Sequence, residues 1–329
     1  MTPPHDLLLL DNADVQALLT HDDTLRCVRR AFEAHSARSG RTFPLVRESL
    51  GGQTVFGIKS GDIAADQALG LKVAGFWPAN RALGKDAHQA TILLMDPATG
   101  RPLGLFDGNH VTAMRTGAAG GIGIQRRARL DRRRLCLFGS GVQARIQLDY
   151  ALQVCPSLSQ VDYVTAQGQP DLALEALFSP RCDIAHAPHA NTAVARADIV
   201  VTATPSRQPL FSRAAVRPGT HINAVGADTK GKRELPEGLL EQALLVVDDT
   251  AQARQLGEAQ WAPADYPLRE IGTLLPDTGN TSDSGWQRPA DAITVFDMTG
   301  IALQDLTVAQ SLYALAGAHG RGRRLAWPW

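Results

Sequence analysis

The chain has 329 residues, which suggests two domains or one large domain with an insertion. Its hydrophobic fraction of 44% and charged fraction of 20% are typical of a globular protein with a sizeable core. The 33 basic and 33 acidic residues give a formal net charge of zero. This balance argues against a nucleic-acid-binding protein, which usually has a basic excess, and against an acidic disordered chain.

The cysteines and the N-terminal segment indicate where the protein works. The four cysteines form no CxxC pair and have no zinc-ligand spacing to histidine, so we expect reduced thiols and no metal site. The first 15 residues lack a basic region and have an apolar run of only four residues, too short for a signal peptide. No stretch approaches the roughly 18 apolar residues of a membrane span. We therefore expect a cytoplasmic protein without a membrane partner.

The first third of the chain predicts a sheet with a helix before it. Residues 6–10 form a short apolar run typical of a buried strand. Residues 11–39 have helical spacing of apolar positions, with Asp11 or Asn12 as the cap. Residues 40–107 then consist of short apolar or alternating runs separated by Gly, Pro or Asp, which predicts a mostly antiparallel sheet.

After residue 107 the pattern changes to alternating strands and helices, which is typical of a parallel α/β sheet. A helix of small residues is expected at 110–125 and a closing helix at 301–320. Because the closing helix follows the α/β part, we expect it to pack back onto the first segment. Between them, strands are expected at 135–138, 161–166, 197–206, 220–228, 244–249 and 293–300, with helices at 144–153 and 170–178.

The most informative motif is a GxGxxA pattern between an expected strand and helix: Gly139, Ser140, Gly141, Val142, Gln143 and Ala144. Gly139 allows the tight turn, and Gly141 lets a pyrophosphate approach the backbone. Ala144 lets the helix pack closely on the strand, and the free N–H groups of the helix face the phosphates. The motif therefore predicts a bound dinucleotide.

The end of the second strand informs the choice between NADH and NADPH. An NAD enzyme usually has an acid there that binds the ribose hydroxyls, but Gln167, Gly168 and Gln169 follow the strand at 161–166. Asp162 lies at the beginning of the strand, where we expect it to be solvated. Since the segment also has no arginine for a 2′-phosphate, we expect NADPH or NADH, with a slight preference for NADPH.

Several motifs occur in a recognisable order. They read DG at 107–108, TAMRTGA at 112–118, GSGVQA at 139–144, VGADTKGKREL at 225–235, and TVFDMTG at 294–300 followed by Gln304 and Asp305. From about residue 40 to 316, the chain resembles the ornithine cyclodeaminase/mu-crystallin family.

The resemblance implies an α/β fold with a Rossmann-type NAD(P)-binding domain and a discontinuous α+β domain. Residues 117–301 would form the Rossmann dinucleotide-binding domain. Residues 1–116 and 302–329 would form the substrate-binding and dimerisation domain, with its sheet at the interface of a homodimer.

The resemblance also implies roles for individual residues. Arg47, Lys72 and Arg115 match positions that hold the substrate carboxylate, and Asp228 matches the residue that handles protons at the substrate nitrogen. An unpaired lysine in the apolar run around Lys72 would be costly, which favours a functional role. The cofactor-binding positions would be Thr116, Gly139, Ser140, Gly141, Val142, Gln143, Ala144, Thr204, Val225 and Lys232.

One position departs from the cyclodeaminases within the family. Lys59 stands where those enzymes have an acid, and a cation there should disfavour the second ammonium group of ornithine. The run that includes Phe76 and Trp77, with His88 beyond it, is more similar to the imine-reductase branch. We expect His88 to contact the substrate.

These observations lead to one predicted function and several alternatives. We expect an NAD(P)H-dependent oxidoreductase that reduces a cyclic imino acid, Δ1-pyrroline-2-carboxylate or Δ1-piperideine-2-carboxylate, to L-proline or L-pipecolate. The partner is then a small carboxylate and not a nucleic acid. The alternatives are an ornithine cyclodeaminase, an alanine or opine-type dehydrogenase, and a non-catalytic NADPH-binding protein like the mu-crystallins.

Overall fold

The computed structural model describes residues 6–129, 131–275 and 288–326. The chain forms two compact units, one from Met1–Arg115 with Ile301–Trp329 and one from Thr116–Gly300. We call them the discontinuous unit and the inserted unit. One contains a mainly antiparallel sheet and the other a parallel sheet, so the predicted α/β class is confirmed. Within the described ranges, no helix is long and apolar enough to cross a membrane.

The sheet of the discontinuous unit has eight strands in the order β16-β1-β7-β6-β5-β4-β2, with β3 paired to β4. Its pairs are antiparallel except β1 with β7. The predicted antiparallel sheet is therefore confirmed, whereas the C-terminal strand β16 was not predicted. The strands are β1 (Asp6–Leu10), β2 (Gly40–Thr42), β3 (Val46–Gly51), β4 (Thr54–Ile63), β5 (Ala68–Phe76), β6 (His88–Met95), β7 (Pro102–Asp107) and β16 (Arg323–Ala326).

The helix predicted over residues 11–39 is two helices, α1 (Asn12–Leu18) and α2 (His21–Ser36). Asp11 caps the first, as predicted. Thr20 caps the second, because its extended backbone lets its Oγ1 accept from the Asp23 N–H at 3.1 Å. The prediction of one continuous helix is wrong because this second cap interrupts it.

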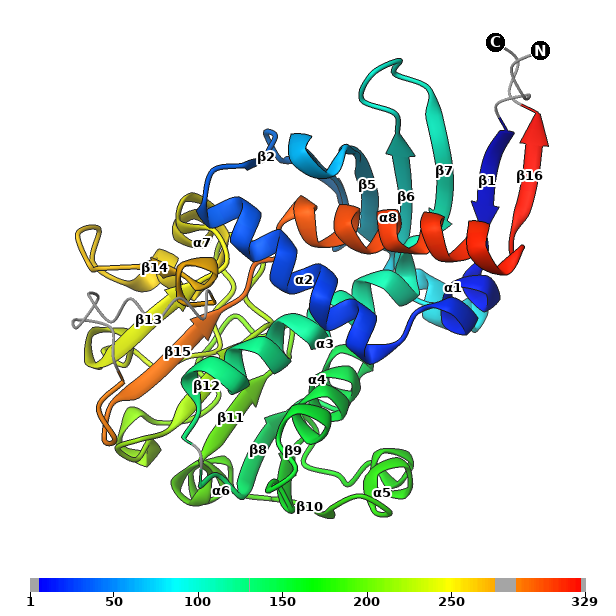
Figure 1. Ribbon diagram of the computed structural model, residues 1–329. Coiled ribbons are helices and arrows are strands. Elements are labelled where there is room, and N and C mark those ends of the chain that lie inside the picture. Colours follow the sequence, from blue (N-terminus) through cyan, green and yellow to red (C-terminus); the bar gives the residue numbers. More distant parts are fainter. Residues whose placement is uncertain (1–5, 130, 276–287, 327–329) are drawn as a thin grey trace. The chain divides into compact units, whose positions relative to one another are not determined.

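The closing helix α8 (Ala302–His319) packs on α2 and on strands β4, β5 and β6, which confirms its predicted return to the first segment (Figure 1). Gly61 of β4 and Gly70 of β5 allow this close contact. A Cβ at Gly61 would lie 3.0 Å from Leu303, and one at Gly70 would lie 2.9 Å from Leu306. The first turns of α8 therefore lie directly against these two strands.

The inserted unit has a second eight-stranded sheet, in the order β10-β9-β8-β11-β12-β15-β13-β14. All of its pairs are parallel. The order reverses direction between β8 and β11, which is where such sheets bind ligands. The strands are β8 (Arg134–Phe138), β9 (Gln160–Val164), β10 (Asp183–His186), β11 (Ile199–Thr202), β12 (His221–Ala224), β13 (Ala243–Val247), β14 (Arg269–Glu270) and β15 (Ile293–Asp297).

Four α-helices of the inserted unit link these strands: α4 (Val142–Val154), α5 (Leu172–Phe178), α6 (Ala190–Arg196) and α7 (Thr250–Leu256). The helix α3 (Gly108–Arg127) begins in the discontinuous unit and ends in the inserted one. Its glycines allow close packing within the inserted unit. A Cβ at Gly117 would lie 2.4 Å from the Tyr150 ring, and one at Gly123 would lie 2.6 Å from the Phe296 ring.

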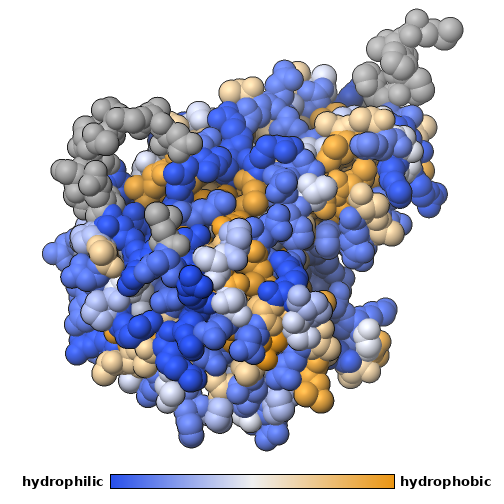
Figure 2. Space-filling view, turned by 60° about the horizontal axis from the view of Figure 1, so that its bottom comes forward, coloured by the Kyte–Doolittle hydropathy of each residue, from blue (hydrophilic) through white to orange (hydrophobic). Residues whose placement is uncertain are grey.

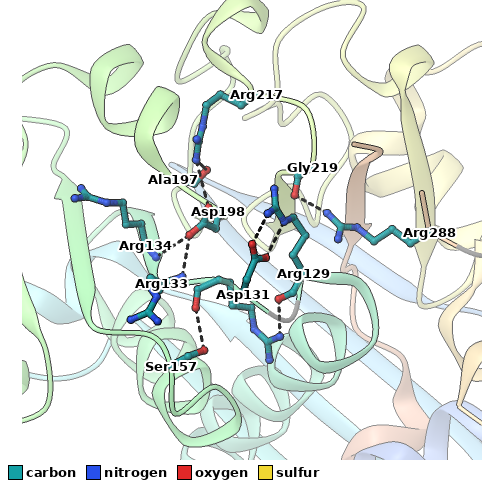
Figure 3. A network of polar contacts seen from close by, with 11 residues as sticks. Arg129, Asp131, Arg133, Arg134, Ser157, Ala197, Asp198, Arg217, Gly219 and Arg288 are labelled. Carbon is teal, nitrogen blue, oxygen red and sulfur yellow. Dashed lines mark hydrogen bonds and ion pairs between the residues drawn. The ribbon is translucent and has the colours of Figure 1, made fainter. Parts of the chain in front are cut away.

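An arginine-rich run after α3 is used in internal contacts of the inserted unit (Figure 3). Asp198 accepts from the backbone N–H groups of Arg133 and Arg134 and from the guanidinium of Arg217. Asp131 pairs with Arg129. These contacts connect the start of β8 with the segments before β11 and β12.

On the face of the molecule seen in Figure 2, hydrophilic residues predominate and hydrophobic residues form smaller groups between them. Such a surface is ordinary for a globular protein. The four cysteines are free thiols; Cys136, Cys155 and Cys182 are buried and Cys27 is half-buried. They behave as small apolar residues, as the sequence indicated.

Candidate active-site residues and the nucleotide loop

Four predicted substrate residues lie on one face of the antiparallel sheet. Lys59 of β4 is directly opposite Lys72 of β5, and Arg47 of β3 pairs with Gly57, two residues before Lys59. His88 of β6 pairs with Phe76, four residues beyond Lys72. Because opposite residues and alternate residues share a face, these side chains leave the sheet on the same side. This is also the face that α8 covers, since Gly61 and Gly70 belong to it.

Lys72 is the most buried of these cations, with 4% of its surface exposed. Its Nζ lies 2.8 Å from Oδ1 and 2.7 Å from Oδ2 of Asp305, in the first turn of α8, and donates to Thr112 Oγ1 at 3.4 Å. The pKa of Lys72 is lowered to about 7, mainly by burial; Arg115 and Lys59 act in the same direction, whereas Asp305 opposes the shift.

Arg115 reaches the same acid from α3. Its Nε lies 3.3 Å from Asp305 Oδ1, and its Nη1 donates to Gln304 Oε1 at 3.3 Å. Gln304 Oε1 also accepts from the backbone N–H of Ile301 at 3.1 Å, which fixes the start of α8. Asp305 is 1% exposed and its pKa is lowered by Lys72 and Arg115 against the effect of burial. Lys72, Arg115 and Asp305 therefore form a buried triad, which we call the basic triad.

Sequence reasoning missed the part that Asp305 plays. The residue was part of a recognised motif, but no role was assigned to it, because its partner Lys72 lies 233 positions away. The available signal was the lysine in an apolar run, since a buried cation needs an acid.

His88 is half-buried and is not a cation at neutral pH. Burial lowers its pKa to about 4, and the charges of Lys72 and Arg115 act in the same direction. Its imidazole lies beside Asn109. A neutral imidazole can donate or accept a hydrogen bond, so His88 adds a polar group to this face and no charge.

The GxGxxA segment forms a strand-to-helix turn in the inserted unit. Gly139 has a φ of +101°, and a Cβ there would lie 2.8 Å from the Ala203 carbonyl oxygen. Gly141 is the N-cap of α4, and a Cβ there would meet no atom within 4 Å. Ala144 is fully buried between helix and sheet. The turn therefore fits a dinucleotide, because the backbone at Gly141 is open to a phosphate while Gly139 and Ala144 hold the turn against the sheet.

Of the other predicted cofactor residues of the inserted unit, Thr204 and Val225 lie at the carboxyl ends of strands and Thr116 lies in α3. Thr204 follows β11, Val225 follows β12, and Thr116 accepts at its carbonyl from Gln147 Nε2 of α4 at 2.7 Å. The strand β9 ends at Val164, two residues earlier than predicted. Asp162 lies mid-strand with its carboxylate 3.4 Å from Arg196, so it is not available at the strand end.

Asp228 and Lys232 are brought together after β12. Lys232 Nζ donates to Asp228 Oδ1 at 2.7 Å, and Thr229 Oγ1 donates to the same oxygen at 3.0 Å. The Asp228 side chain is 43% exposed. A carboxylate that is fixed by a lysine and open to solvent can exchange protons with a ligand or with water.

Comparison with known proteins shows the family of the chain. The model of the ornithine cyclodeaminase/mu-crystallin family matches residues 6–319. The chain belongs to this family. It is 33% identical over 320 residues to the iminosuccinate reductase of Paracoccus denitrificans, covering 95% of this chain and 98% of that protein.

Two solved structures share the whole fold. One is an archaeal alanine dehydrogenase dimer with bound NAD, with a TM-score of 0.89 and 29% identity, covering 98% of this chain and all of the other. The second is the Thermococcus litoralis Δ1-pyrroline-2-carboxylate reductase in complex with NADH and L-proline. It has a TM-score of 0.88 and 27% identity, covering 97% of this chain and all of the other. These relatives are named for different substrates but have similar sequence identity to this chain, so identity does not show which substrate this chain uses.

Proposed function

We propose that this chain uses NADH or NADPH to reduce a cyclic imino acid, Δ1-pyrroline-2-carboxylate or Δ1-piperideine-2-carboxylate, to L-proline or L-pipecolate. The chain is an oxidoreductase of amino or imino acids that uses a nicotinamide cofactor, like its relatives at about 30% identity. The observation that carries the finer proposal is the basic triad with Lys59 beside it. Two buried cations, Lys72 and Arg115, share one aspartate, and this leaves an excess of positive charge that favours an anionic ligand.

We assign the substrate carboxylate to Arg115 and Lys72, with Arg47 and Lys59 on the same face of the sheet. A guanidinium can bind a carboxylate with two hydrogen bonds, and an ammonium adds a point charge. Asp305 keeps both cations in place and neutralises one of them. His88 is assigned a neutral hydrogen bond to the substrate.

We assign the proton step to Asp228, which would support protonation at the imine nitrogen directly or through water. When bound, the nicotinamide supplies the hydride. Gly139, Ser140, Gly141, Val142, Gln143 and Ala144 would hold the pyrophosphate, with Thr116, Thr204, Val225 and Lys232 around the rest of the cofactor. In this proposal residues 117–301 form the dinucleotide-binding domain, and residues 1–116 with 302–329 form the substrate and dimerisation domain.

For the cofactor we propose use of both forms with a slight preference for NADPH. Gln167, Gly168 and Gln169, not an acid, follow the end of β9, Asp162 is paired with Arg196, and Asp171 farther on is paired with Arg145. Titration of nicotinamide fluorescence with NADH and NADPH tests this directly. A Kd for NADH more than about tenfold below that for NADPH would overturn the preference.

A second candidate substrate is an acyclic imino dicarboxylate. It is favoured by the position of Lys59 directly opposite Lys72, because two lysines on one face of the sheet offer cations to two carboxylates. A substrate with a second carboxylate would use both lysines.

One assay separates these functions. Purified protein is mixed with NADPH or NADH and one of three substrates: Δ1-pyrroline-2-carboxylate, oxaloacetate with ammonia, or pyruvate with ammonia. Oxidation of the nicotinamide is then followed. Turnover of the cyclic imine at least tenfold faster than of either mixture is expected. In a parallel reaction with L-ornithine, conversion to proline and ammonia without imine reduction in the assay would contradict the proposal. Tight NADPH binding without any turnover would favour a binding protein.

We propose a homodimer formed through the other face of the antiparallel sheet. That face carries an apolar row that includes Leu71, Leu93 and Leu105, which are neighbours across β5, β6 and β7. Leu105 is 38% exposed, and Val46 and Leu325 on the same face are each 40% exposed. Leu93→Asp should convert a dimer into a monomer in light scattering, whereas a wild-type monomer would refute this interface.

We propose a cytoplasmic location, as the sequence suggested. The four cysteines are free thiols, and three of them are buried in apolar surroundings. Reduced thiols and a nicotinamide cofactor both suit a reducing compartment. Fractionation of cells that produce the protein would test the location.

A further inference from the structure

Three fully buried carboxyl side chains are connected in the inserted unit. Glu234 lies in the segment after Asp228, Glu258 begins the short 3-10 helix η5 (Glu258–Trp261), and Asp297 ends β15. Each is 0% exposed. Among the described residues, none of the three has an ion-pair partner. Buried carboxylates without cations are costly, so their arrangement calls for an explanation.

Glu234 joins the two loops that follow β11 and β12. Its Oε1 accepts from both the N–H and the Oγ1–H of Thr204 at 2.7 Å, and its Oε2 accepts from the N–H of Gly226 at 2.8 Å. A Cβ at Gly226 would lie 2.6 Å from this carboxyl group, so the loop must have glycine there. One side chain therefore sets the spacing of the segments that carry Thr204, Val225 and Asp228.

Glu258 fixes the backbone of Glu234, and Asp297 fixes the short helix η5 that carries Glu258. Oε1 of Glu258 accepts from the backbone N–H of Glu234 at 2.6 Å. Oδ2 of Asp297 accepts from the backbone N–H of Ala259 at 2.8 Å, which fixes η5 against the end of β15. The contacts thus run from the central sheet through η5 to Glu234 and on to the two loops.

The remaining oxygen of each supporting carboxyl, Oε2 of Glu258 and Oδ1 of Asp297, is buried and accepts no hydrogen bond from the residues that the structure describes. The charged groups that face them are Glu234 and Asp248, the residue directly after β13, and both are acids. Asp248 is satisfied by other donors, Thr299 Oγ1 at 2.7 Å and the Asp249 N–H at 2.9 Å. Each of the two carboxyls therefore has one buried oxygen without a donor among the described residues, and its charged neighbours are acids. Burial raises the pKa of both Glu258 and Asp297 to about 8. The charges of Asp297 and Glu234 add to the rise at Glu258, and those of Asp248 and Glu234 add to the rise at Asp297.

We propose that Glu234 is a positioning residue for the loops that carry Thr204, Val225 and Asp228, and that one proton shared between Glu258 and Asp297 keeps it in place. The inference rests on the proposed function only where it assigns these loops to the cofactor and to the proton step. When the shared proton is lost, two adjacent anions repel each other and η5 no longer supports Glu234. Nicotinamide binding then weakens as the pH rises through about 8.

The positioning part is tested with Glu234→Gln. The amide keeps the shape but replaces one acceptor oxygen with an NH₂ group, which cannot accept from Gly226 or Thr204. We expect the Kd for NADH to rise about tenfold and the backbone N–H groups of Thr204 and Gly226 to exchange faster in the cofactor-free protein. The matched control is Glu237→Gln, an exposed glutamate three residues away, which should change neither quantity. If Glu234→Gln leaves both quantities unchanged, the positioning role is wrong.

The shared proton is tested with Glu258→Gln and Asp297→Asn. Each amide donates permanently to the remaining carboxylate, as the protonated acid would. We expect each variant to bind NADH at pH 7 within about twofold of wild type and to lose the weakening that wild type shows between pH 7 and 9. A wild-type pH dependence in both variants would overturn the shared proton. Amide exchange needs no cofactor or substrate, so it decides the positioning role even if the chain reduces no imino acid.

Discussion

The two units bury charge in opposite ways. In the discontinuous unit, Lys72 and Arg115 are buried with one acid, Asp305, and the group keeps an excess of positive charge. In the inserted unit, buried carboxyls such as Glu234 and Glu258 accept mainly from backbone N–H groups and have no cation partner among the described residues. The first arrangement attracts an anion. In the second, the carboxyls already accept from backbone N–H groups, so these side chains hold the neighbouring loops in place.

The pKa shifts of the two regions follow from this difference. Burial lowers the pKa of Lys72 from the ordinary lysine value to about 7. It raises the pKa values of Glu258 and Asp297 from the ordinary carboxyl values to about 8. In both cases burial favours the neutral form. The comparison predicts that the first region controls substrate binding and the second controls cofactor binding. Mutations in the first region should change KM or kcat/KM for the substrate, and mutations in the second should change the Kd for NADH.

The largest expected effect comes from Arg115→Ala. This change removes the guanidinium that faces Asp305 and leaves Lys72 as the partner of that acid. We expect kcat/KM for the imino acid to fall about a thousandfold, while the Kd for NADH stays within about twofold of wild type. The control is Arg41→Ala, whose guanidinium is 71% exposed in a surface pair with Asp62 and should matter little. An active Arg115→Ala enzyme would show that the carboxylate is bound elsewhere.

Asp305→Asn should have the next largest effect. Because Asp305 raises the pKa of Lys72, its removal lowers that pKa further, so less of the lysine is charged at neutral pH. We expect KM to rise about a hundredfold at pH 7 with a smaller change in kcat, and Asp62→Asn to behave as wild type. Steady-state kinetics across pH 6 to 9 measure this. A fall in kcat alone, with KM unchanged, would contradict the role of Asp305 in substrate binding.

The pH dependence of KM follows from Lys72 itself. Its protonated form binds the carboxylate, and that form is lost as the pH rises through about 7. KM should therefore increase above pH 7, by up to about tenfold per pH unit. Since the imine of the substrate also takes up a proton, the comparison is with Lys72→Arg, whose charge persists. An equal increase in both enzymes would show that Lys72 does not cause it.

The smallest expected effect concerns the stability of the inserted unit. The folded-state pKa values of Glu258 and Asp297 are raised to about 8. The stability that comes from their protons is therefore fully present below the ordinary carboxyl pKa and is lost as the pH rises through about 8. Between pH 7 and 9 the Tm of wild type should fall by about 2–4 °C more than that of Glu258→Gln. Parallel melting curves of the two proteins would contradict this.

Local patterns in the sequence were sufficient for most of the fold. Alternating runs in residues 40–107 predicted the antiparallel sheet, and the GxGxxA turn predicted the strand and helix on either side of it. Strand β16 was missed because Arg323–Ala326 has no alternation, and it becomes a strand only by pairing with β1 from the other end of the chain. The break at Thr20 was missed because a cap within a continuous helical pattern is a weak signal.

For the candidate site, the sequence identified the cations but not the acids that hold them. Lys72 and Arg115 belong to recognisable motifs, and both lie in the basic triad. Asp305, which holds both cations, lacked an assigned role because its contact with Lys72 joins segments far apart in sequence. Burial and hydrogen-bond partners of a carboxylate depend on tertiary packing, which a single sequence does not reveal.

The position of β15 has a consequence for how the protein is made. This strand, Ile293–Asp297, lies between β12 and β13, although it is synthesised after both. While the chain emerges from the ribosome, the edges of β12 and β13 that later pair with β15 stay unpaired until nearly nine-tenths of the sequence has been translated. Exposed edges of apolar strands are prone to aggregation. We expect chains that end before β15 to accumulate as insoluble fragments.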